Sequence, residues 1–173
     1  MDPVSLEFGT IKLRPLLSND SLKLSELANN KKIWDNVRDF FPHPYSENNA
    51  IEFIEICRKE DPQVTFAIEF EGELVGVIGL IPQSDIYALS AEIGYWIGEQ
   101  YWNNGIATEA IGLIVPYGFY TLDLRRIYSG VFDFNKASQR VLEKCGFELE
   151  GIFKNAIIKN NKIVNEYRYA IVR

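Results

Sequence analysis

The sequence predicts an α/β (α+β) fold in one domain that spans residues 1–173. The chain is long enough for one domain with a sizeable core and too short for two domains of ordinary size. Its apolar residues follow the two-residue period of strands and the 3.6-residue period of helices, in the order β α α β β β α β α β β. This order gives about seven strands and about four helices. Two pairs of strand-like segments are joined directly by turn residues, which indicates antiparallel hairpins within the sheet.

The N-terminal half is predicted to hold one strand, two helices and a hairpin. Alternating apolar residues indicate a strand over residues 6–16, and Ser18-Asn19-Asp20 is typical of a helix start. Residues 33–45 mix aromatic, charged and proline residues, which fits neither a strand nor one long helix. A second helix begins at Ser46-Glu47-Asn48-Asn49. The hairpin follows, with its turn at Glu71-Gly72-Glu73.

The C-terminal half is predicted to hold a central strand, a long helix, a further strand and helix, and a closing hairpin. Pro116 lies inside the long helix, so we expect a kink or a break near Ile114. The predicted ranges are 88–98 for the central strand, a helix that begins after Gly105, a strand over 126–132, a helix over 136–145, and a hairpin formed by 147–158 and 163–172.

Composition excludes several classes of function. The net charge of -6 and the pI of about 4.9 oppose nucleic-acid binding, which depends on attraction to phosphates. Cys57 and Cys145 have no CxxC spacing and His43 is the only histidine, so we expect no metal site and no disulfide framework. The first residues lack a leader pattern, and Pro116 interrupts the longest apolar run. We therefore expect a cytoplasmic protein that does not enter a membrane.

Residues 100–110, Gln-Tyr-Trp-Asn-Asn-Gly-Ile-Ala-Thr-Glu-Ala, lie where a strand, a tight loop and a helix start meet. Gly105 and Ala107 leave the backbone unobstructed, so successive N–H groups can converge on an anion. The helix adds roughly half a positive charge at its start. These features predict a phosphate-binding loop, although a tight turn followed by ordinary first-turn residues would carry the same sequence.

This loop and residues 135–147, Asn-Lys-Ala-Ser-Gln-Arg-Val-Leu-Glu-Lys-Cys-Gly-Phe, resemble the GNAT superfamily of acetyl-CoA-dependent N-acetyltransferases. Residues 92–97, Tyr101-Trp102 and the pair Asn135 and Ser138 are similar to the RimJ/RimL branch, which acetylates protein N-terminal amines and various small amines. The resemblance spans nearly the whole chain. It implies a single mixed, mostly antiparallel central sheet, splayed at the cofactor site and flanked by helices, with acetyl-CoA as cosubstrate and no metal.

The resemblance also implies which residues bind the cofactor. The backbone of Tyr95 and Ile97 would pair with the pantetheine arm as a further strand does, although both side chains could equally be core residues. Asn103 stands where many family members have glycine. The backbone amides of the loop would bind the pyrophosphate, and Asn135 and Ser138 would add contacts to the cofactor. The set is Tyr95, Ile97, Trp102, Asn103, Asn104, Gly105, Ile106, Ala107, Thr108, Asn135 and Ser138.

Attack of an amine on a thioester requires a base, an oxyanion partner and an acid. Glu92 is the predicted base, because a carboxylate among apolar strand residues has a raised pKa; the alternative is a solvated carboxylate at a strand end. The resemblance implies that Ser138 protonates the thiolate, whereas Asn135 and Ser138 could simply begin a helix. Many family members carry a tyrosine at the position of Leu142, so water is the other candidate acid.

Residues Phe41, His43 and Tyr45 are the predicted acceptor-binding residues, with a packed aromatic corner as the alternative. The acceptor is most simply a protein or peptide N-terminal amine. A small cationic amine such as a polyamine, aminoglycoside or amino-acid derivative is the second hypothesis, and a non-catalytic acyl-CoA-binding module is the third. Acidic residues near the expected acceptor segment would suit a cation or merely aid solubility: Asp35, Asp39, Glu47, Glu52 and Glu55. The final strands leave a homodimer possible.

Overall fold

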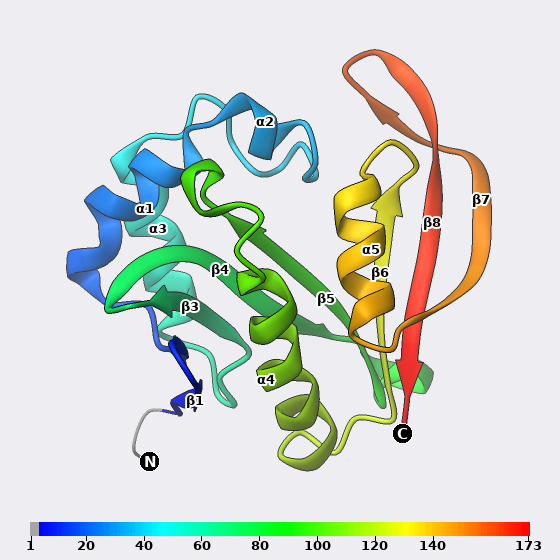
Figure 1. The fold of residues 1–173 in the computed structure, drawn as a ribbon, viewed down its shortest axis with the longest axis horizontal. Coiled ribbons are helices and arrows are strands. Elements are labelled where there is room, and N and C mark those ends of the chain that lie inside the picture. Colours follow the sequence, from blue (N-terminus) through cyan, green and yellow to red (C-terminus); the bar gives the residue numbers. More distant parts are fainter. Residues whose placement is uncertain (1–3) are drawn as a thin grey trace. The chain divides into compact units, whose positions relative to one another are not determined.

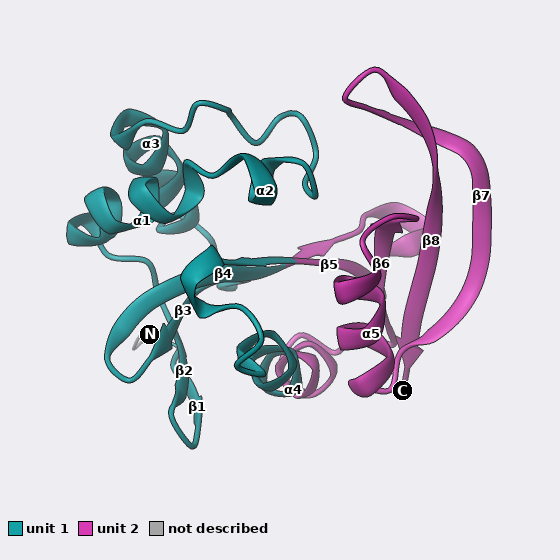
Figure 2. Ribbon diagram, turned by 45° about the horizontal axis from the view of Figure 1, so that its top comes forward, with its two compact units in different colours: residues 1–79, 95–114 teal, residues 80–94, 115–173 magenta. Residues whose placement is uncertain are grey.

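The structure is a computed structural model that describes residues 4–173; the first three residues of the N-terminal segment, in which no leader pattern is predicted, lie outside the described residues. The predicted α/β class is confirmed. The described chain forms an eight-stranded, mostly antiparallel sheet in the order β1-β2-β3-β4-β5-β6-β8-β7, with five α-helices. The chain divides into two compact units (Figure 2): residues 1–79 with 95–114, and residues 80–94 with 115–173.

The first unit contains the antiparallel strands β1 (Leu6–Phe8), β2 (Ile11–Arg14) and β3 (Thr65–Phe70). β4 (Glu73–Pro82) pairs with β3 and continues into the second unit. The prediction of one strand over residues 6–16 is wrong, because a turn separates β1 from β2. Gly9 takes a left-handed φ of 59° there, which glycine adopts without steric cost.

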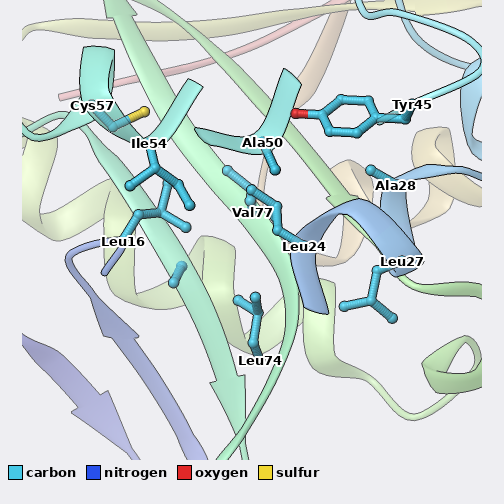
Figure 3. Close-up of a cluster of buried hydrophobic side chains, with 11 residues drawn as sticks. Leu16, Leu24, Leu27, Ala28, Tyr45, Ala50, Ile54, Cys57, Leu74 and Val77 are labelled. Atoms are coloured by element: carbon cyan, nitrogen blue, oxygen red, sulfur yellow. The ribbon is translucent and has the colours of Figure 1, made fainter. Parts of the chain in front are cut away.

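Helices of the first unit bury one face each against its sheet. They are α1 (Ser21–Ala28), the four-residue α2 (Lys31–Trp34) and α3 (Glu47–Cys57). The Ser46 hydroxyl accepts a hydrogen bond from the Asn49 amide and caps α3, as predicted. The buried cluster, most of which Figure 3 labels, consists of Leu16, Leu24, Leu27, Ala28, Tyr45, Ala50, Ile54, Cys57, Ala67, Leu74 and Val77.

The second unit contains β6 (Arg126–Phe132), α5 (Lys136–Lys144), β7 (Glu148–Lys159) and β8 (Lys162–Val172). β5 (Ser90–Ile97) begins in this unit and pairs in parallel with β6, which pairs in turn with the antiparallel hairpin of β8 and β7. The predicted turn between β7 and β8 is confirmed. Its central residues, Asn160 and Asn161, both have positive φ, as a tight hairpin requires. Figure 1 shows α5 lying along β6 and β8.

α4 (Ile106–Tyr120) follows β5 and includes Pro116. Of the predicted kink or break near Ile114, the break is therefore wrong, because the helix continues through Pro116. A proline inside a helix costs about 3 kcal/mol, but apolar residues on both sides of it, including Val115 and Tyr117, are buried, and their burial offsets that cost. Among residues 4–173, no helix has the length and apolar character needed to cross a membrane.

The variant Gly76→Ala tests how closely β4 packs against β5. A Cβ built at Gly76 would lie 2.2 Å from the Trp96 carbonyl oxygen, whereas one at Gly112, on the exposed side of α4, would meet no atom within 4 Å. We expect Gly76→Ala to lower the free energy of unfolding by about 1–3 kcal/mol and Gly112→Ala to raise it by up to about 1 kcal/mol, measured by chemical denaturation. Equal stabilities for the two variants would contradict the close approach.

Candidate functional site

The loop after β5 is held to the first unit's sheet by two hydrogen bonds at its base. The Gly98 amide donates to the Val75 carbonyl over 2.8 Å. The indole Nε1 of Trp102 donates to the Ile97 carbonyl over 2.7 Å, which folds the loop back onto the end of the strand. Trp102 thus closes the loop while its ring stays partly exposed.

The loop then makes a tight turn into α4. Asn103 and Gly105 have positive φ values of 64° and 76°. The side chain of Asn104 donates to the carbonyls of Tyr101 and Trp102 over 3.1 and 3.3 Å, which fixes the turn from within. A turn of this kind points successive backbone N–H groups toward one concave side.

The first turn of α4 completes the anion-binding geometry. The helix begins at Ile106, and the Glu109 amide already donates to the Gly105 carbonyl over 3.1 Å. The amides that precede this bond point out of the positive end of the helix. The loop therefore combines a tight turn with a helix start, the two features from which phosphate binding is predicted.

The structure brings Ile97 and Trp102 together directly, and places Tyr95 two residues earlier on the same strand. Ile97 is buried and Tyr95 is half-buried. Because the Ile97 carbonyl already accepts the indole hydrogen bond, pairing with a pantetheine arm would use its amide or its second lone pair.

The predicted acceptor-binding residues belong to an aromatic group in the first unit. Phe41 lies 4.9 Å from Tyr45 and 6.0 Å from Trp96 between ring centroids, and His43 stacks on Trp34 at 5.5 Å. His43 is exposed and Phe41 is half-buried. Tyr45 is part of the buried cluster, where burial raises its pKa to about 12. Tyr45 is therefore a core residue, as in the alternative of a packed aromatic corner, whereas the rings of Phe41 and His43 border solvent.

Glu99 joins this segment to the cofactor loop, a link that the sequence did not reveal. Its Oε2 accepts a hydrogen bond from the Asn30 amide group over 2.7 Å, and its Oε1 pairs with the Lys32 ammonium. These hydrogen bonds, first that of Lys32, lower the pKa of Glu99. The start of α2, with its N-cap Asn30 and Lys32, and the residues after β5 are therefore tied together through one carboxylate.

Glu92 lies in the second unit, on the last residue pair that joins β5 to β6. The parallel register pairs Ser90 with Arg126 and ends with Glu92 opposite Tyr128. One residue further, the Ser129 hydroxyl donates to the Ile93 carbonyl over 3.2 Å. Glu92 is half-buried, as its predicted position on a central strand requires, and it stands where the backbone pairing of the two strands stops.

Asn135 and Ser138 start α5, which is the structural role that their spacing allowed. The Asn135 side-chain oxygen accepts a hydrogen bond from the Ser138 amide over 3.1 Å and caps the helix. Both side chains are half-buried. Leu142 is fully buried, so the position at which many family members carry a tyrosine contributes to the core here.

The two cysteines are not suited to nucleophilic chemistry. Burial raises the pKa of the Cys57 thiol to about 12, and burial also raises that of Cys145. A thiol with a raised pKa holds little thiolate at neutral pH. Within residues 4–173, no three or more His, Cys, Asp or Glu side chains are grouped in a way that could hold a metal ion.

Comparison with known proteins places this geometry in a family. Residues 10–148 match the family model described as the acetyltransferase (GNAT) domain. YjcK of Bacillus subtilis, a probable N-acetyltransferase, is 33% identical over 91% of this chain and 89% of its own length. YoaA of the same organism, an uncharacterized N-acetyltransferase, is 41% identical, but that match spans 58% of this chain and 56% of YoaA. Spermidine N(1)-acetyltransferase of Escherichia coli is 29% identical over 94% of this chain and 86% of that enzyme.

Solved structures share the fold. A GNAT-family acetyltransferase from Bacillus anthracis superposes with a TM-score of 0.84 at 26% identity, covering 98% of both chains. RimJ of Mycobacterium smegmatis, solved in complex with CoA-disulfide, superposes with a TM-score of 0.84 at 24% identity over 98% of this chain and 86% of its own. The resemblance to the RimJ/RimL branch thus holds at the level of the fold.

Gly105 offers a test of the phosphate-binding turn. Gly105 and Gly9 both have positive φ and open space around the missing Cβ, so an alanine strains the backbone similarly at either position, by about 1 kcal/mol. We expect Gly105→Ala to weaken coenzyme A binding by about tenfold, because the loop amides lose their alignment, and Gly9→Ala to leave that affinity unchanged. Calorimetric titration with coenzyme A measures both. Equal affinities would remove the turn from the binding site.

Proposed function

Since the chain belongs to the GNAT family of acetyltransferases, we propose that it transfers the acetyl group of acetyl-CoA to a primary amine by direct attack in a ternary complex. The chain is thus an acyltransferase, of a family that uses acetyl-CoA. The observation that carries the proposal is the turn at Asn103 and Gly105, both with positive φ, which leads directly into the N-terminus of α4. A diphosphate is the anion that such a series of backbone donors binds.

The cofactor contacts follow from this turn. The backbone amides of residues 102–108 hold the pyrophosphate, and the strand backbone at Tyr95 and Ile97 pairs with the pantetheine arm. Asn135 keeps its side-chain amide N–H groups for the cofactor, because its capping hydrogen bond uses only the oxygen. Asn103, which is exposed, adds a possible side-chain donor beside the phosphates.

The chemistry requires that the amine lose a proton before it attacks. Glu92 accepts this proton, directly or through water, and the neutral nitrogen attacks the thioester carbonyl carbon to give a tetrahedral oxyanion. The carbon–sulfur bond then breaks, and coenzyme A leaves as a thiolate that Ser138 or water protonates. Buried Leu142 supplies no hydroxyl for this last step.

A protein or peptide N-terminal amine is the first acceptor class. Its reference pKa is near 8, so a half-buried carboxylate that works through water suffices to deprotonate it. The exposed His43 and half-buried Phe41 supply a surface on which the first side chain of a peptide can pack. The fold shared with RimJ supports this class at the level of architecture only.

A small cationic amine is the second acceptor class. It is favoured by the relative from E. coli, whose name states acetylation of spermidine and whose similarity extends over nearly the whole chain. The net charge of -6 attracts polyamines over a long range.

The proposal also includes a reduced, cytoplasmic setting, in which both cysteines remain thiols.

Thiol release from acetyl-CoA tests the function and divides the acceptor classes. We expect release with at least one member of a panel of free N-terminal peptides, polyamines and aminoglycosides, above the rate with acetyl-CoA alone. Release with peptides only supports the first class, and release with polyamines or aminoglycosides supports the second. Binding of acetyl-CoA without release across the panel would favour a non-catalytic acyl-CoA-binding module.

Glu92→Gln tests the base. The amide retains the shape of the carboxylate but accepts no proton, so we expect kcat to fall about 100- to 10,000-fold while coenzyme A affinity stays the same. Ser138→Ala is the comparison, because loss of a replaceable acid lowers kcat less and leaves the acidic limb of the pH profile in place. An unchanged rate and pH profile for Glu92→Gln would show that another group is the base.

A further inference from the structure

The face of the second unit's sheet that carries Glu92 also carries Glu166 and Arg168. Residues paired across a ladder point to the same side, and β6 pairs Tyr128 with Ala170, Gly130 with Arg168 and Phe132 with Glu166. Because Glu92 lies opposite Tyr128, all of these side chains share one face.

α5 covers the opposite face of the same strands. Tyr169 donates its hydroxyl to Glu143 of α5 over 2.9 Å, and the Lys136 ammonium lies 4.9 Å from the ring centroid of Tyr167. These two tyrosines pair with Ser129 and Val131 and so alternate with the Glu166 and Arg168 side. The helix that bears Asn135 and Ser138 thus packs on the face opposite to the one that carries Glu92, and the pairing of β5 with β6 stops at Glu92.

Gly130 leaves the space that the Glu166 carboxylate occupies. A Cβ built at Gly130 would lie 2.9 Å from each oxygen of Glu166 and 2.7 Å from its carboxyl carbon. Gly130 is two residues beyond Tyr128 on β6, so this carboxylate lies one strand across and two residues along from Glu92. On a regular sheet, the Cα positions of Glu92 and Gly130 lie roughly 8 Å apart.

Arg168 fixes the carboxylate in this position. Its Nε and Nη2 both donate to Oε1 of Glu166, the former over 3.0 Å. The guanidinium itself lies 4.9 Å from the Tyr128 ring centroid and 4.6 Å from that of Phe153. The Glu166 side chain is only 15% exposed, yet among residues 4–173 Oε2 takes no hydrogen bond. One oxygen is therefore held by the arginine and the other is available to a ligand.

We infer that Glu166 binds a second ammonium group of the acceptor, and hence that the preferred acceptor is a diamine or polyamine. An extended chain of about four methylene groups separates two amines by roughly 6 Å, which matches the spacing from Glu92 when a hydrogen bond is added. The remote ammonium donates to Oε2 while the other amine, beside Glu92, loses its proton and reacts. Arg168 is a positioning residue, since it acts through Glu166.

This inference rests on the proposed function, because it assigns a role to the acceptor half of that site. It therefore needs a measurement that does not depend on turnover. Calorimetric titration of 1,4-diaminobutane and of 1-butylamine into the full chain without acetyl-CoA provides it. The two ligands have the same carbon chain and differ in the second amine.

We expect the wild-type chain to bind the diamine at least tenfold more tightly than the monoamine, and Glu166→Gln to lower the diamine affinity by about 10- to 100-fold with little effect on the monoamine. Glu150→Gln is the matched control: Glu150 also pairs with an arginine, Arg126 at 2.5 Å, but at the other end of the strand pair. Gly130→Ala, which displaces the carboxylate without removing it, should weaken diamine binding in the same direction.

Equal affinity of the wild-type chain for the diamine and the monoamine, or an unchanged preference in a folded Glu166→Gln variant, would overturn the inference. Equal losses in Glu166→Gln and Glu150→Gln would also overturn it, because they would show a general charge effect. Diamine binding that depends on Glu166 without any acetyl transfer would contradict the proposed function and leave this inference standing.

Discussion

The close approach of β4 to β5 at Gly76 is the constraint on which the candidate cofactor loop depends. A side chain at Gly76 would collide with the Trp96 carbonyl, so only glycine lets the two strands stay in contact this near the end of β5. The Val75 carbonyl then receives the Gly98 amide, and the chain turns at a defined place. The Trp102 indole donates a hydrogen bond to the Ile97 carbonyl, and α4 begins at Ile106. The anion-binding geometry thus starts from a steric requirement in the preceding strand.

Local chemistry explains which elements could be predicted from the sequence. The turn at Asn160-Asn161, the cap at Ser46 and the strand over residues 126–132 depend on neighbours in sequence, and the structure confirms all three. The turn between β1 and β2 was missed because the apolar residues on both sides of Gly9 were joined into one strand, although their alternation changes from even to odd positions there. Pro116 was given too much weight, because the burial that keeps α4 intact depends on packing across the fold.

The distinction between signals from sequence neighbours and contacts between distant residues also applies to the candidate site. The loop of residues 102–108 was predictable because its turn and its helix start are contiguous in sequence. The roles of Gly130 and Glu166 were not, since they depend on the register between β6 and β8, which no local pattern specifies. The buried position of Tyr45 likewise follows from the packing of α1 and α3, and only the structure shows that its ring belongs to the core.

The contacts of Glu99 with Asn30 and Lys32 connect two segments in which the sequence predicts ligand binding. Because Asn30 and Lys32 precede the aromatic segment and Glu99 precedes the cofactor loop, a ligand that favours one arrangement of either segment changes the free energy of the other. By linkage this coupling has the same magnitude in both directions. The lowered pKa of Glu99 sets its range: the ion pair is complete above the ordinary carboxylate pKa and is lost as the pH falls through the lowered value. At neutral pH Glu99 therefore links the start of α2 to the segment before the cofactor loop by a charged interaction, and added salt weakens that interaction.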